Sequence, residues 1–520
     1  MLPGLHCTFE RLYGPMPVFR AGIARKSWKA AASLVRSLGG RLVSLWGADR
    51  RPIDGQFAVH AAYATSSGLA WLTLPVADSP RVYPAVDDVF PAAARMQRAM
   101  VDLLGLVPEE HHDARPWLRH DAWPADYHPL LAERTGREKF EVGNDPYAFV
   151  PVEGDGVHEI PVGPVHAGVI EPGHFRFAVV GEKVLRLEQR LGYTHKGIEK
   201  LFEGHEPLDP DCASLAARVS GDSTVAYGWA YAMAVESAAT CEVPQRAQWL
   251  RALALERERV ANHLGDLGAL GNDAGFAFGL AQFSRLKEDW LRLNAAAFGH
   301  RYLMDYVVPG GVRGDPGHML LQALERQCTE IGHEVAQLRL IYDEHTGLQD
   351  RFAGAGRVAP ELASRLGLTG LAGRASGQVH DLRGDFALPP YAELGVAHAA
   401  NSQGDVAARV AVRFDETLES LRLLRAIANR LQETDPAAEV HAAPAAVAST
   451  ACGVGWVEGW RGEVLVALEL DQYGVIRRCH CHDPSWQNWP LLEHAVIGNI
   501  VPDFPLINKS FNLSYSGHDL

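Results

Sequence analysis

The spacing of apolar residues changes twice along the chain, and each change indicates a different kind of structure. Residues 1–135 contain short apolar runs at Leu42–Trp46 and Leu69–Leu74 and one stretch with helical spacing near Ala92–Leu104, which together predict a small α+β domain. Proline and glycine are frequent towards 136–160, so we expect a linker there. We expect residues 161–520 to form a mainly helical domain with small β elements, which makes the fold class α+β.

Long helices dominate the pattern between Gly197 and Ala428. The segment Trp249–Leu270 has one apolar stripe at helical spacing and beside it a second, charged stripe. The members of the second stripe are Glu256, Arg259, His263 and Asp266. Such a stripe is usually a solvated face with salt bridges, but here it borders a long apolar stripe, so burial against other helices is the alternative. Strand-like patterns occur at Phe175–Leu187, which predicts a hairpin, and in the tail from Gly453.

Composition limits the possible partners. The chain has 520 residues, enough for two or three domains, and its formal charge of −14 disfavours binding to nucleic acid. No stretch reaches the roughly 18 apolar residues of a membrane-spanning helix, and the first residues lack the apolar run of a signal peptide. We therefore expect a cytoplasmic protein that has no direct membrane span and meets a membrane only through partner subunits.

The seven cysteines do not form the pattern of a disulfide framework or a closed zinc site. They are few for this length and odd in number, which favours reduced thiols. Cys479 and Cys481 stand close together in Cys-His-Cys-His, and on a strand they would share one face. That face offers two ligands where a closed zinc site needs four.

Several motifs, in this order, resemble the large subunit of group 4 nickel-iron hydrogenases and the homologous 49-kilodalton subunit of complex I. They are GPVHAGVIEPGHFRF (163–177), GYTHKGIEKL (192–201), ERVANHLGDLGAL (258–270), VVPGGV (307–312), GRASG (373–377) and GDVAAR (404–409). In the first domain, MQRAMVDLLGL (96–106) and RPWLRHDAWPADYHPL (115–130) resemble the 30-kilodalton subunit of complex I. The resemblance implies a fused arrangement of the kind found in formate hydrogenlyase-type complexes.

The resemblance also implies where nickel-binding cysteines would stand. The family holds nickel and iron with an Arg-x-Cys-Gly-x-Cys motif and an Asp-Pro-Cys-x-x-Cys motif, which align here with residues 218–223 and 483–488. The four ligand positions are then occupied by Ser220, Ser223, Ser485 and Asn488. Hydroxyl and amide groups do not replace soft thiolate ligands. We therefore expect no nickel-iron chemistry, no cofactor bound by this chain, and no cleavage of the 32 residues after Asn488. We expect the hydroxyls of Ser220 and Ser223 to bond back to their own helix.

Quinone reduction in the manner of complex I is also in doubt. Of the headgroup-binding positions that the resemblance implies, only the first histidine is kept, as His166. The others align with Pro172, Gly221 and Leu303.

The resemblance gathers the remaining ionisable residues around one cavity. Glu171 matches a glutamate that passes protons near the nickel in hydrogenases. Arg218 and Asp222 stand four apart and could form an ion pair on one helix. The residues that would converge on the same cavity are Arg374, Asp381, Arg383 and Asp483. Two interpretations stay open for the cluster: a proton or charge relay, and a self-neutralising salt-bridge network.

Three functions are compatible with these residues. The resemblance implies the core large subunit of an ion-translocating oxidoreductase complex on the inner face of the cell membrane, beside a small subunit carrying a [4Fe-4S] cluster and antiporter-like membrane subunits. The second is a non-catalytic scaffold in such a complex. The third is a metalloenzyme that uses Cys479, Cys481 and their histidines. No Gly-x-Gly-x-x-Gly follows a strand, so an NADH link would run through another subunit.

Overall fold

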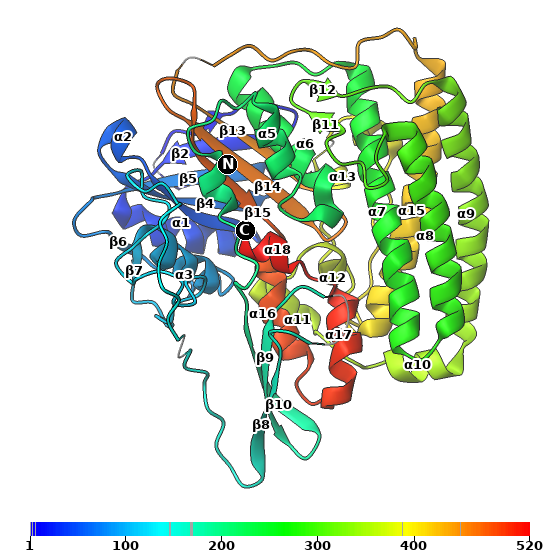
Figure 1. Cartoon of the computed structure of the whole chain (residues 1–520), viewed down its shortest axis with the longest axis horizontal. Helices are drawn as coiled ribbons and strands as arrows, with labels where there is room; N and C mark the ends of the chain where they lie inside the picture. Colours follow the sequence, from blue (N-terminus) through cyan, green and yellow to red (C-terminus); the bar gives the residue numbers. More distant parts are fainter. Residues whose placement is uncertain are drawn as a thin grey trace.

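The computed structural model describes residues 2, 4–5, 7–144, 147–166, 170–386, 388–447 and 449–520. It confirms the α+β class. Two mainly β parts lie on one side of the molecule and a bundle of long helices on the other (Figure 1).

The N-terminal part is a five-stranded sheet with the order β1-β2-β5-β4-β3. Its strands are β1 (Glu10–Arg11), β2 (Val18–Gly22), β3 (Arg41–Asp49), β4 (Phe57–Thr65) and β5 (Gly68–Val76). Strands β2 and β5 run parallel, and the other pairs are antiparallel. The remaining elements are α1 (Arg25–Ser37), α2 (Arg51–Asp54), β6 (Val82–Pro84), α3 (Ala93–Leu104) and β7 (Val107–Glu109). The two apolar runs predicted from sequence thus fall in β3 and β5, and the helical stretch is α3.

A three-stranded sheet projects from the body of the molecule (Figure 1). It consists of β8 (Val157–Val162), β9 (His174–Val180) and β10 (Lys183–Arg190), with β9 in the centre. The predicted hairpin is confirmed as β9 and β10. Strand β8 begins inside the predicted linker, and the connection from β8 to β9 carries His166 and Glu171.

Long helices form the other side of the molecule. Helix α7 (Gln245–Asp273) packs against α8 (Ala277–Phe298) and α15 (Val406–Glu433), and α15 packs against α9 (His318–Glu344). The charged stripe of α7 is buried, which decides between the two sequence-based alternatives in favour of burial. Shorter elements complete this part: α4 (Ile198–Phe202), α5 (Pro210–Ala216), η1 (Gly221–Ser223), α6 (Thr224–Ala239), β11 (Val307–Val308), β12 (Gly311–Val312), α10 (Thr346–Phe352), α11 (Pro360–Leu366), α12 (Gly370–Arg374), α13 (Leu382–Asp385) and α14 (Tyr391–Leu394).

The C-terminal part joins the two sides. Strands β13 (Ala451–Glu458), β14 (Glu463–Leu470) and β15 (Ile476–His482) form an antiparallel sheet on which α6 packs. Glycine is required at 453 and 455, since a Cβ atom there would overlap the carbonyl oxygens of Ala234 and Ala230. The chain ends with α16 (Ser485–Ala495), η2 (Val501–Asp503), α17 (Phe504–Phe511) and α18 (Tyr515–Asp519). Figure 1 shows α18 between the sheets and the helix bundle.

The N-terminal sheet is docked firmly on the rest of the chain. The Ser44 hydroxyl lies 2.8 Å from Nε2 of His480, and Nδ1 of His480 lies 2.7 Å from Glu199. The Trp46 ring stacks on His480 with 4.7 Å between ring centroids. One continuous apolar core therefore runs through both parts of the molecule. Among the described residues, none of the helices has the length and apolarity needed to cross a bilayer.

Candidate functional site

Two serine hydroxyls meet at the centre of the molecule. Ser220 precedes η1, and its Oγ lies 2.8 Å from Oγ of Ser514 and donates to Asp222 at 2.8 Å. Both serines are 3% exposed. The prediction that Ser220 and Ser223 bond back to their own helix is wrong: both residues precede α6, and the Ser223 hydroxyl accepts a hydrogen bond from Arg461 instead.

Asn488 does not lie beside Ser220 and Ser223, as the alignment of the second ligand motif requires. Asn488 bonds to the backbone of Thr369 through both ends of its amide, at 3.1 and 3.2 Å, and not to Ser220 or Ser223. The residue that faces Ser220 is Ser514, which stands in Asn-Leu-Ser-Tyr-Ser-Gly with the spacing of the family's second motif. The geometry therefore assigns this pair to Ser514 and Gly517, correcting the assignment to Ser485 and Asn488.

The C-terminal segment fills the space in which we expected a cavity. Ser514 donates its backbone N–H to Oγ of Ser485 at 2.9 Å, and Ser516 donates its own to Glu171 at 3.0 Å. A Cβ atom on Gly517 would lie 2.5 Å from Oδ2 of Asp483, so even one methyl group does not fit there. The 32 residues after Asn488 are thus part of the folded core.

Asp222 and Arg218 do not pair with each other. Helix α5 ends at Ala216, so the two residues do not share a helix turn, and Arg218 instead bonds to Asp305 at 2.6 and 2.8 Å. The partner of Asp222 is Arg461, whose NH1 group lies 2.7 Å from Oδ1. Burial would raise the pKa of Asp222, but the Arg461 guanidinium outweighs it and holds the pKa below its ordinary value.

Asp483 belongs to the serine cluster. Its Oδ1 accepts the N–H of Ser485 at 2.8 Å, and its Oδ2 accepts the hydroxyl of Tyr227 at 3.0 Å. Burial, followed by the Asp483 carboxylate, raises the pKa of Tyr227 far above its ordinary value, so this tyrosine stays protonated and acts as a donor. The expected convergence of Asp483 with Arg374, Asp381 and Arg383 is therefore not what the hydrogen bonds show.

Arg374, Asp381 and Arg383 form a second, fully buried network. Arg374 bonds to Glu416 at 2.7 Å and to Glu458 at 2.8 Å, and Arg383 bonds to Asp381 at 2.6 Å. Its charged members are Arg259, Arg374, Arg383, Glu256, Asp381, Glu416 and Glu458, with His263 in contact with Glu416. Four carboxyl groups thus face three guanidinium groups. Burial raises the pKa of Glu458 above its ordinary value, so this carboxyl group is the one most easily protonated in the network.

A buried carboxyl group that the sequence did not single out lies under Asp222. Glu258 accepts the backbone N–H groups of Val225 at 2.6 Å and Ala226 at 3.2 Å, at the start of α6. Burial raises its pKa to about 8, so Glu258 can hold a proton at neutral pH. The only sequence signal was its place in the motif ERVANHLGDLGAL.

The other predicted residues lie apart from the serine cluster. His166 has its Nε2 atom buried without a hydrogen-bond partner among the described residues, and its ring lies 6.1 Å from that of Phe175. Cys479 and Cys481 are buried on β15, where burial raises the pKa of Cys479 far above its ordinary value. The described residues contain no cluster of three or more His, Cys, Asp or Glu side chains placed to hold a metal ion.

The residues at the four ligand positions do not fit a nickel-iron centre. They are three serines and one glycine, and Ser220 and Ser514 are hydrogen-bonded to each other. A neutral hydroxyl is a hard, weak donor, whereas nickel and low-spin iron bind soft thiolates. Hydroxyls, carboxyls and one guanidinium group are the polar side-chain groups named at this site.

Comparisons with known proteins agree with the fold. Residues 21–139 match the family described as respiratory-chain NADH dehydrogenase, 30 Kd subunit, and residues 273–452 match the 49 Kd subunit family. Formate hydrogenlyase subunit 5 of Escherichia coli is 30% identical over 92% of this chain and 85% of that protein. Hydrogenase-4 component G of the same organism is 32% identical over 92% of this chain and 84% of its own length. A chain of the archaeal membrane-bound sulfane sulfur reductase superposes with a TM-score of 0.65 at 24% identity, covering 71% of this chain and all of that one.

Proposed function

We propose that this chain is the core subunit of a membrane-associated oxidoreductase complex that operates without a nickel-iron centre. The chain belongs to the fused large-subunit family of group 4 hydrogenases and complex I. The observation that carries the proposal is the contact between Ser220 and Ser514 at 2.8 Å. It supports the proposal because two hydroxyls that bond to each other are poor ligands for nickel and low-spin iron.

The serine cluster can still move a proton. The hydroxyls of Ser514 and Ser220 can exchange donor and acceptor roles and so pass a proton to Asp222. Glu171 is exposed and accepts the backbone N–H of Ser516, two residues after Ser514, so it lies between the C-terminal segment and the surface. In this proposal an electron that arrives near the serine cluster adds negative charge there. Glu171 and Asp222 then take up or release protons, and this change of charge drives ion movement.

The partner subunits follow from the family and from the surface around Glu171. Val165 is 89% exposed and Ile170 is 43% exposed, on the same connection as Glu171. Exposed apolar side chains of this kind favour a protein interface. We propose that this surface contacts a small subunit carrying a [4Fe-4S] cluster, and that antiporter-like subunits hold the complex on the inner face of the cell membrane.

The substitution Glu171→Gln in the assembled complex tests the relay. It keeps the size and hydrogen-bonding capacity of the side chain and removes its charge, so we expect ion transport to be lost while the complex still assembles. Glu182→Gln is the matched control, because Glu182 is exposed in the turn between β9 and β10. Full transport in the Glu171→Gln complex would contradict the relay.

The tight packing of the C-terminal segment favours one alternative, a scaffold without turnover. Gly517 leaves no room beside Asp483, and Ser514 and Ser485 hold each other. If Glu171→Gln and Asp222→Asn both leave transport and growth unchanged, the scaffold is the better account.

A further inference from the structure

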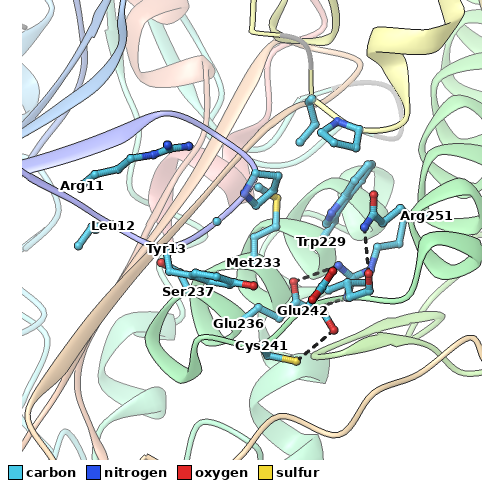
Figure 2. A pocket seen from close by; sticks show the side chains of 16 residues that line it. Arg11, Leu12, Tyr13, Trp229, Met233, Glu236, Ser237, Cys241, Glu242 and Arg251 are labelled. Atoms are coloured by element: carbon cyan, nitrogen blue, oxygen red, sulfur yellow. Dashed lines mark hydrogen bonds and ion pairs between the residues drawn. The ribbon is translucent and has the colours of Figure 1, made fainter.

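A second candidate site lies at the far end of α6. A cavity of about 600 Å³ opens between residues 11–15 of the N-terminal part, the C-terminal half of α6 and the connection from α6 to α7 (Figure 2). The lining residues of α6 run from Trp229 to Ser237, so the cavity lies roughly 9 to 21 Å along the helix axis from Ser223. Its volume is within the range of small-molecule sites, which often lie between domains.

Aromatic and soft side chains form the walls. Trp229, Met233 and Ser237 follow one another at intervals of four on the face of α6 that lines the cavity, and Tyr13 lines it from the N-terminal segment. Trp229 and Met233 are each 3% exposed, so their positions are fixed by packing. The hydroxyl of Ser237, which is 7% exposed, is buried and has no hydrogen-bond partner among the described residues.

The floor of the cavity is a rigid, neutral ion pair. Glu236 accepts hydrogen bonds from Arg251 at 2.5 and 3.1 Å and from the backbone N–H of Gly310 at 2.7 Å. Arg251 also donates to the carbonyl oxygens of Val308 and Gly311. Four hydrogen bonds thus hold the guanidinium, and its ion pair with Glu236 carries no net charge to repel a cation in the cavity.

The side of the cavity near Tyr13 is electronegative. Glu242 is exposed there and forms no ion pair within the described part of the chain, and the last carbonyl groups of α6 add partial negative charge. Burial, followed by the Glu242 carboxylate, raises the pKa of Tyr13. In Figure 2 the Tyr13 ring extends towards Glu236 and Glu242, whereas Arg11 lies apart on the other side.

We propose that this cavity binds an organic cation that has an aromatic or aliphatic body. The cationic group lies against the exposed ring of Tyr13 and close to Glu242, and the body of the ligand lies along the face of α6 that carries Trp229, Met233 and Ser237. Aromatic faces attract cations through their quadrupole, and a nearby carboxylate adds to this attraction. Because the walls come from both parts of the molecule, bound ligand holds the N-terminal segment against α6.

Calorimetric titration of the full chain with benzyltrimethylammonium tests this proposal, with benzyl alcohol as the uncharged aromatic control. We expect saturable binding of the cation and an affinity for benzyl alcohol about 2- to 30-fold weaker, the range of a cation–aromatic contact. Tyr13→Leu and Glu242→Gln should each weaken cation binding. Met233→Trp should abolish it by filling the cavity.

Arg11→Gln is the matched control, since it removes the opposite charge from the same lining and should leave cation binding equal or tighter. Thermal unfolding of each variant confirms that it folds; Arg11, Tyr13 and Glu242 are exposed, and position 233 remains apolar. Absence of saturable binding to the wild-type chain, or equal affinity for benzyl alcohol, would overturn the proposal. Binding that survives Met233→Trp unchanged would place the ligand elsewhere and overturn it as well.

Discussion

The hydroxyl oxygens of Ser220 and Ser514 lie 2.8 Å apart, although 294 positions separate the two residues in the chain. This contact favours Ser514 over Asn488 as the residue that stands opposite Ser220. It makes the serine cluster a hydrogen-bonded assembly of hydroxyls and carboxyls closed by the C-terminal segment.

The contact predicts a disulfide in a double cysteine variant. In Ser220→Cys/Ser514→Cys the two sulfur atoms should come within bonding reach, because a disulfide needs Cβ atoms about 4 Å apart. Oxidation followed by peptide mass spectrometry should recover residues 220 and 514 in one cross-linked peptide. Ser220→Cys/Asn488→Cys is the control, and a cross-link in this pair but not in the first would restore the original alignment.

Gly517 should be intolerant of any side chain. Gly517→Ala places a methyl group 2.5 Å from Oδ2 of Asp483, and overpacking of this kind costs roughly 1–3 kcal/mol of unfolding free energy. Urea denaturation measures the change. Gly314→Ala is the matched control, since a Cβ atom there has nothing within 4 Å and its backbone is not left-handed; equal stability of the two variants would contradict the packing.

Loss of Arg461 should lower the unfolding free energy more than loss of Arg218. Arg461 is 7% exposed, and its loss would leave the Asn512 carbonyl and the partly exposed Asp222 carboxylate without their partner, so Arg461→Met should cost about 1–3 kcal/mol. The Arg218 side chain is 46% exposed, and breaking its pair with Asp305 should cost under about 1 kcal/mol. Similar denaturation midpoints for Arg461→Met and Arg218→Met would refute this ranking.

Acid should destabilise the docking of the N-terminal sheet. Burial lowers the pKa of His482 to about 3, and burial likewise lowers the pKa values of His60 and His480. An unfolded histidine has a pKa of about 6.5, so below that pH the unfolded chain binds more protons than the folded one. The unfolding free energy should therefore fall as pH decreases from about 6.5 towards 3. Urea midpoints measured across this range check it, and His482→Gln should reduce the slope.

The sequence predicted the elements better than it predicted the contacts. Short apolar runs fall in β3 and β5, helical spacing indicated α3 and α7, and the alternating pattern indicated the β9–β10 hairpin, because each pattern reflects local burial. The partner of Arg218 could not be predicted in this way. The spacing to Asp222 suggested a helical pair, but α5 ends before Arg218 and Asp305 comes from a distant segment.

The C-terminal segment also makes contacts with distant residues that its sequence does not predict. Asp483-Pro484 is identical to the first two residues of the family motif, so the motif was aligned there. Asn512-Leu513-Ser514 matches the motif only in spacing. Only the fold, by bringing α18 beside η1, distinguishes the two. Glu258 was missed because its buried environment comes from the start of α6, which no pattern within α7 reveals.

Elemental analysis of the purified complex, with nickel quantified per copy of this chain, tests the central claim most directly. Serine at positions 220, 223 and 514 and glycine at 517 offer no thiolate, so the account predicts no stoichiometric nickel and no hydrogen evolution by this chain. One nickel per chain, retained through purification and lost in Ser220→Ala/Ser514→Ala, would contradict it.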